Sequence, residues 1–104
     1  MRNLYTEEEI IVCTYIARFG RDDFKENDVA KITNRSLSSI KMKVQNIASM
    51  LDEEDFECNQ EISKLTGLPA GQKGRKTNWD IVKRYTTNNR ADYLEICKKI
   101  FKKI

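Results

Sequence analysis

Apolar residues recur at helical spacing along most of the 104-residue chain. The first such stretch predicts a helix over about residues 7–19. Thr6 is a suitable N-cap, Glu9 three residues later completes a capping box, and Gly20 is a typical helix stop. The side chains expected to face inward are Ile10, Cys13, Ile16 and Ala17.

The next two segments predict helices of about residues 25–33 and 37–51. Asn34 and Arg35 form a tight turn between them, and Ser36 caps the longer helix. This spacing suits a helix-turn-helix unit with the first helix packed across it. In the longer helix, one apolar stripe is expected to face the core, namely Leu37, Ile40, Val44, Ile47 and Leu51.

The rest of the chain predicts an irregular region followed by two more helices. Residues 52–77 are expected to form a basic loop or wing, and helices follow at about 79–86 and 91–103. Trp79 is expected in the core. The last helix has an apolar side made of Tyr93, Leu94, Cys97, Ile100, Phe101 and Ile104. Strand signals are weak, so we expect one compact all-α domain over residues 1–104.

The net charge of +3 is small, but the two signs are segregated along the chain. Basic residues dominate residues 35–49 and 71–85, whereas residues 52–57 hold five acidic side chains. This segregation predicts one electropositive face and one electronegative face.

The absence of histidine excludes several kinds of chemistry. A Ser-His-Asp triad, a Cys-His pair, a His-ligated zinc and an HNH nuclease centre all require imidazole. Magnesium chemistry based on carboxylates alone would have its only dense source in residues 52–57, which we interpret as a solvated helix end and turn. We therefore expect a non-enzymatic protein with no catalytic residue, metal site or cofactor.

The cysteines and the hydropathy indicate a cytoplasmic protein. Cys13, Cys58 and Cys97 are odd in number and widely spaced, which favours reduced thiols over disulfides. No signal peptide is recognisable, and no apolar run approaches the roughly 20 residues that a membrane span needs. We expect no membrane association.

The outward side of the predicted helix 37–51 is polar and basic, and no acidic residue interrupts it. Ser and Lys side chains bind phosphate oxygens, while Gln and Asn bind adenine edges. This composition favours a DNA groove; the alternatives are a solvated face and a surface for a protein partner. The expected DNA-binding residues here are Arg35, Ser36, Ser38, Ser39, Lys41, Lys43, Gln45 and Asn46. We expect Lys41 and Lys43 to be exposed.

A second basic segment, GQKGRKTNW, spans residues 71–79. Lys73, Arg75 and Lys76 are expected to follow the phosphate backbone beside the groove. The lysine-rich end, residues 98–103, is expected to be solvated and to contact phosphate only secondarily.

Two stretches of the chain, YTEEEII (5–11) and NRSLSSIKMKVQNIASMLD (34–52), resemble the N-terminal DNA-recognition region of bacterial HNH-type restriction endonucleases. Residues 71–85 are similar to the basic, Gly-rich stretch of that family, while Leu37 replaces its usual proline. Because the chain has no histidine for the family's nuclease centre, the resemblance implies recognition without cleavage. It assigns DNA contact to Ser38, Ser39, Lys41, Lys43, Gln45 and Asn46.

These patterns together predict a double-stranded DNA-binding protein, a regulator or recognition module of a bacterial or phage system, that reads the major groove with helix 37–51. A homodimer through the C-terminal apolar stripe would supply symmetric half-sites, although the same stripe suits the protein's own core equally well. The alternative is a small phage or bacterial protein-binding module that inhibits a host nuclease or defence complex through the acidic residues 52–57.

Overall fold

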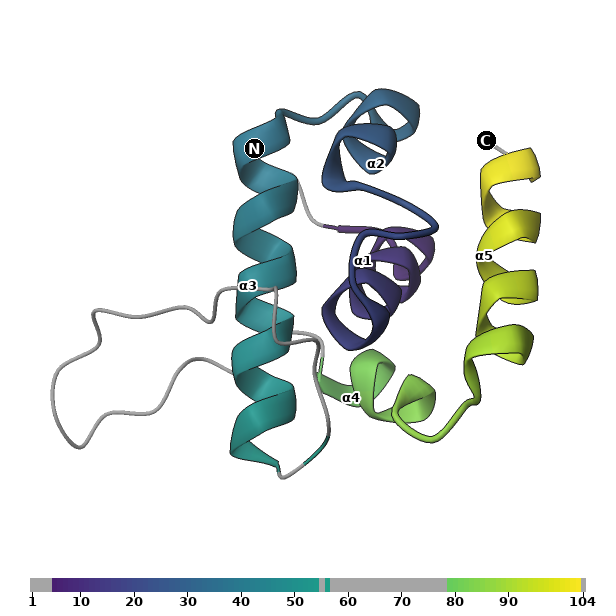
Figure 1. The fold of residues 1–104 in the computed structure, drawn as a ribbon. Helices are drawn as coiled ribbons and strands as arrows, with labels where there is room; N and C mark the ends of the chain where they lie inside the picture. The colour runs from purple at the N-terminus through teal and green to yellow at the C-terminus, as the bar shows by residue number, and fades with distance from the viewer. Residues whose placement is uncertain (1–4, 55, 57–78, 104) are drawn as a thin grey trace, which may run out of the picture.

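The computed structural model describes residues 5–54, 56 and 79–103 (Figure 1). Within this part of the chain every regular element is helical, which confirms the predicted all-α fold. The elements, in chain order, are α1 (Glu7–Phe19), α2 (Glu26–Thr33), α3 (Leu37–Glu53), α4 (Trp79–Val82), the 3-10 turn η1 (Lys83–Tyr85) and α5 (Arg90–Lys103).

The predicted helix bounds are accurate to within two residues for α1, α2, α3 and α5. The single helix predicted over residues 79–86 is divided into α4 and η1. Trp79 is half-buried and packs against the core, with its ring centroid 6.1 Å from that of Phe56. Of the predicted basic loop, residues 52–53 belong to α3, whereas residues 55 and 57–77 lie outside the described residues.

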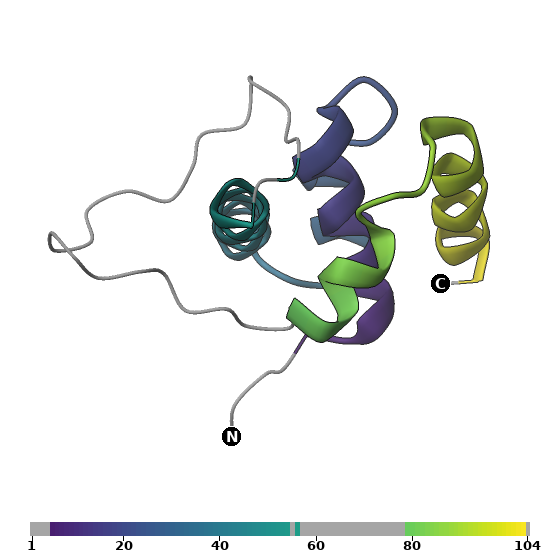
Figure 2. The same ribbon diagram turned by 90° about the horizontal axis from the view of Figure 1, so that it is seen from below.

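Helix α1 is the centre of the fold. It lies between α3 and α5 in both views (Figures 1 and 2) and also contacts α2 and α4. Nine consecutive residues, Glu9 to Ala17, are therefore buried. The predicted inward stripe of α1 is confirmed, but it is only part of the buried surface, because neighbouring helices also cover Ile11, Val12, Thr14 and Tyr15.

Local hydrogen bonds define both ends of α1, as the sequence predicts. Thr6 Oγ1 accepts the backbone N–H of Glu9 at 3.2 Å, and Glu9 Oε1 accepts the N–H of Thr6 at 2.6 Å. This is a complete capping box. At the other end Gly20 has φ 87°, a conformation that favours glycine, and its N–H donates to Ile16 O at 2.8 Å.

A tight turn joins α2 to α3. Asn34 is left-handed (φ 56°, ψ 37°), and the N–H of Arg35 donates to the Ala30 carbonyl at 3.2 Å. Ser36 then caps α3, because its Oγ accepts the N–H of Ser39 at 3.2 Å. The chain therefore changes direction within three residues, which fixes the N-terminal end of α3 beside α2.

Four members of the predicted inward stripe of α3 are confirmed as buried, namely Ile40, Val44, Ile47 and Leu51. The prediction for Leu37 is wrong, because 38% of this residue is exposed. Leu37 is the first residue of α3, and the packed part of the helix begins about one turn later, at Ile40. The buried surface is also wider than the stripe, since Lys43, Ala48 and Met50 belong to it.

The apolar side of α5 closes the protein's own core. Tyr93, Cys97 and Ile100 are buried, and Leu94 and Phe101 pack against the core from its edge. Figure 1 shows α5 beside α1, where Phe101 stacks on Phe24 with ring centroids 4.5 Å apart. Arg90 ties the start of α5 to Asp23 at 2.9 Å. The described residues thus show the stripe as core, while Ile104 lies outside them.

Buried thiol and phenol groups are expected to make the core sensitive to alkaline pH. Burial raises the pKa of Cys13 and of Cys97 to about 12, and burial with the hydrogen bond to Asp23 raises the pKa of Tyr15 to about 12. Because these folded-state values exceed the unfolded ones, their contribution to stability is complete below about pH 9 and is lost as the pH rises toward about 12. Burial also raises the pKa of Tyr93, so four buried thiol and phenol groups act in this direction, whereas burial lowers the pKa of Lys43, which acts in the opposite direction.

We therefore expect the urea midpoint of unfolding, followed by helical circular dichroism, to fall steadily between about pH 9 and pH 11. A Cys97→Ala variant should show a shallower fall, because one of the titrating thiols is gone. A midpoint that stays constant over this range would contradict the prediction.

Candidate nucleic-acid interface

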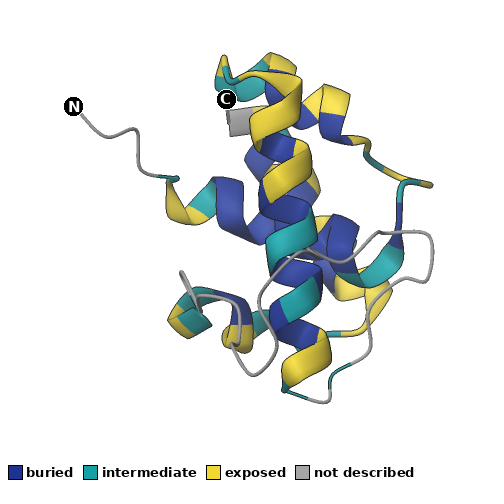
Figure 3. Cartoon of the chain, turned by 90° about the vertical axis from the view of Figure 1, so that its left-hand side faces the viewer, coloured by how far each residue is buried: buried dark blue, intermediate teal, exposed yellow. Residues whose placement is uncertain are grey.

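The outward face of α3 is accessible mainly in its first two turns. Ser38, Met42, Gln45 and Ser49 follow i, i+4, i+7 and i+11 and therefore share one face of the helix. Ser38 and Met42 are exposed, whereas Gln45 and Ser49 are half-buried. Figure 3 shows exposed residues at both ends of α3 and more buried ones between them. We call the exposed N-terminal residues the α3 tip: Ser36, Leu37, Ser38, Ser39, Lys41 and Met42.

The predicted DNA-binding residues divide into three groups. Ser36, Ser38, Ser39 and Lys41 are exposed in the α3 tip. Gln45, Asn46 and Arg35 are half-buried, and Lys43 is buried. The third group, Lys73, Arg75 and Lys76, lies outside the described residues. The structure therefore brings together four of the eight residues predicted around helix 37–51 as one accessible surface.

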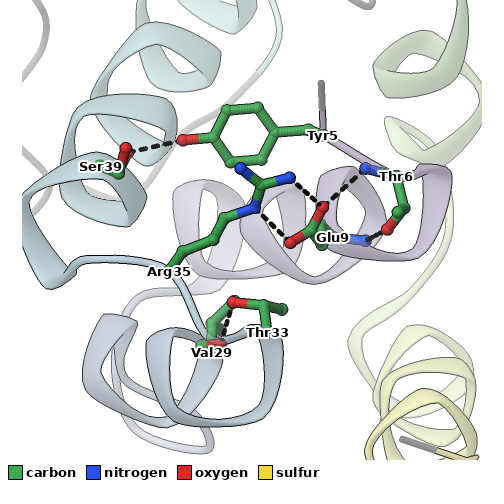
Figure 4. A network of polar contacts seen from close by, with 7 residues as sticks. All are labelled: Tyr5, Thr6, Glu9, Val29, Thr33, Arg35 and Ser39. Atoms are coloured by element: carbon green, nitrogen blue, oxygen red, sulfur yellow. Dashed lines mark hydrogen bonds and ion pairs between the residues drawn. The ribbon is translucent and has the colours of Figure 1, made fainter. Parts of the chain in front are cut away.

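Arg35 is held within the protein by Glu9. Its Nε and Nη2 both donate to the Glu9 carboxylate, with Nη2 at 3.0 Å from Oε1 (Figure 4). The two side chains are only 17% and 4% exposed. Because Glu9 also accepts the N–H of Thr6, one carboxylate connects the start of α1 to the turn before α3. Arg35 thus serves to position α3.

Tyr5 adds a second connection to the same end of α3. Its hydroxyl donates to the Ser39 carbonyl at 2.9 Å, and the Arg35 guanidinium lies 4.3 Å from its ring centroid (Figure 4). A cation over an aromatic face is attracted by the ring's negative charge density. Sequence reasoning missed Tyr5, because its position just before the capping box carries no information about a partner 34 residues away.

The charge of Glu9 is maintained by these contacts. Burial alone would raise the pKa of Glu9, but the hydrogen bonds from Arg35 and Thr6 outweigh burial, so the pKa lies below its ordinary value. Glu9 is therefore ionised at neutral pH. The contacts that fix the α3 tip persist over the pH range in which DNA binding would be measured.

The prediction of an exposed Lys43 is wrong. Only 7% of this residue is exposed, and its Nζ lies 5.3 Å from the Tyr5 ring centroid. Burial lowers the pKa of Lys43, which interacts electrostatically with the Cys13 thiol. The physical reason is the width of the buried side of α3, because Tyr5 and α1 cover a part of the helix that lies beyond its apolar stripe.

Charge of opposite sign is found at the far end of α3. Asp52 and Glu53 are exposed there, about 20 Å along the helix axis from Ser38 at 1.5 Å per residue. The exposed lysines of α5, Lys98 and Lys99 among them, are on the other side of α1 from α3 (Figures 1 and 2). Helix α1 therefore separates α5 from α3 in both views.

No three His, Cys, Asp or Glu side chains in the described part of the chain are placed to hold a metal ion. Among the helices described, none has the length and apolar character needed to cross a membrane. No family model, curated protein or solved structure matches the chain.

Proposed function

We propose that this protein binds double-stranded DNA by placing the α3 tip in the major groove, as a regulator or recognition module of a bacterial or phage system. The observation that carries the proposal is the α3 tip itself. It is an exposed helix end with three serine hydroxyls, one lysine and no acidic residue.

The chemistry of the α3 tip suits a phosphate-lined groove. Ser38 and Lys41 offer a hydroxyl and an ammonium group, which bond phosphate oxygens. The first backbone N–H groups of a helix have no acceptor within the helix, and they carry partial positive charge. Helix N-termini therefore attract phosphate, and a helix end of this kind enters the major groove in helix-turn-helix proteins.

Rigid placement of the helix end also supports the proposal. Arg35 and Tyr5 connect the α2–α3 turn and the first turn of α3 to the start of α1. A surface that is fixed before binding loses little conformational entropy when it meets its partner. The resemblance of residues 34–52 to a DNA-recognition region points the same way.

A homodimer remains part of the proposal, because two copies would read symmetric half-sites. Since Tyr93, Cys97 and Ile100 are buried in the core, an interface at α5 would use the outward side of that helix. The sequence also proposes contacts to the DNA phosphate backbone from Lys73, Arg75 and Lys76.

The direct test compares two charge reversals at exposed lysines. In Lys41→Glu, binding to a short duplex should weaken by roughly tenfold or more, and the slope of log affinity against log salt should become shallower by about one. Lys98→Glu, on α5, is the matched control and should change affinity far less. Fluorescence anisotropy at two or more salt concentrations measures both effects.

Two results would count against DNA binding through the α3 tip. If Lys41→Glu and Lys98→Glu weaken binding equally, the attraction is a property of net charge and not of α3. If the wild-type protein binds no duplex even at low salt, the alternative of a protein-binding inhibitor takes over. Its binding surface would then include Asp52 and Glu53, which are exposed.

A further inference from the structure

Two large hydrophobic residues are exposed in the described part of the chain, and both belong to the α3 tip. Leu37 is 38% exposed and Met42 is 61% exposed. Other large apolar residues of the described helices are buried or half-buried. A single exposed apolar residue is common on protein surfaces and requires no explanation. Here two exposed apolar residues lie within two turns of one helix, among serines and a lysine. The α3 tip is therefore partly apolar.

Met42 has a central place on this surface. It follows Lys41 directly and is four residues after Ser38, so it projects from the same face as the Ser38 hydroxyl. Its side chain is long, unbranched and polarisable, and it adapts to the shape of an apolar group. The thioether is only a weak hydrogen-bond acceptor, so it cannot read the donors and acceptors of base edges as Ser or Lys does.

On the basis of the proposed function, we infer that Met42 selects thymine in the bound DNA. The thymine C5-methyl group is the one apolar group that a base pair presents in the major groove, and apolar side chains contact it. In this arrangement Ser38 and Lys41 hold the phosphate backbone, and Met42 contacts the methyl group.

The test removes the methyl group alone. A duplex that the protein retains from a random DNA pool is remade with each thymine replaced in turn by deoxyuridine, which keeps every hydrogen-bonding group. At one or two positions the wild-type affinity should fall about fourfold, the ratio that corresponds to about 0.8 kcal/mol for one buried methyl group. In Met42→Ala the thymine and deoxyuridine duplexes should bind equally.

The matched control is Ser38→Ala on the same face. It should weaken every duplex by a similar factor and keep the preference for thymine, and circular dichroism should show both variants folded. If deoxyuridine is tolerated at every position, or if Met42→Ala keeps the full preference, the inference fails while DNA binding stands. If no duplex is retained from the pool, DNA binding itself fails, which is a distinguishable result.

Discussion

Replacing Glu9 by alanine is expected to destabilise the protein by about 3 kcal/mol, the lower part of the range for breaking a buried ion pair. The change leaves the largely buried Arg35 guanidinium without the carboxylate to which Nε and Nη2 donate. It also removes the capping-box acceptor of the Thr6 N–H. For a chain of this length the loss corresponds to a fall in Tm of roughly 10–20 °C, measurable by thermal circular dichroism.

Two further variants separate the causes of this loss. Glu9→Gln keeps a side chain suited to the capping box but removes the charge, so it should destabilise the protein less than Glu9→Ala. Adding Arg35→Met to Glu9→Ala should recover part of the stability, because the largely buried guanidinium that has lost the Glu9 carboxylate is then removed as well. An unchanged Tm in Glu9→Ala, or a double variant less stable than Glu9→Ala, would show that the pair does not act as described.

Lysines two positions apart in α3 are expected to respond very differently to charge reversal. Lys43→Glu should cost about 3 kcal/mol or more, because it places a carboxylate at a position where only 7% of the residue is exposed. Lys41→Glu changes an exposed residue and should alter the free energy of unfolding by about 0.5 kcal/mol or less. Urea denaturation of the two variants measures the difference directly.

A neutral substitution completes this comparison. Lys43→Met keeps much of the side-chain length and removes the ammonium charge, which burial disfavours. It should therefore change the free energy of unfolding by no more than about 1 kcal/mol. Similar midpoints for Lys43→Glu and Lys41→Glu would show that Lys43 is not buried. The charge at Lys41 can thus be reversed without disturbing the fold, whereas the charge at Lys43 cannot. Lys41 is therefore the suitable position for testing DNA binding by charge reversal.

The candidate surface was only partly predictable from the sequence. Composition identified the polar side of α3, and helical spacing correctly placed Ser38 and Lys41 on its exposed side. The same reasoning treated Lys43 as an equal partner of Lys41, because both are lysines in a stretch without acids. It also had no reason to single out Met42, since a lone methionine on a polar face carries no signal until its exposure is known.

The sequence by itself determined where α1 begins and ends and where α3 begins, because those signals act over a few residues. The Thr6–Glu9 capping box, the Ser36 cap and Gly20 each satisfy backbone groups within one helical turn, and all are found where they were expected. Only the tertiary structure decided which side chains are buried. Glu9 meets Arg35 across 26 residues and Tyr5 meets Ser39 across 34. Such contacts depend on which helices surround α1, and no local pattern along the chain specifies that arrangement.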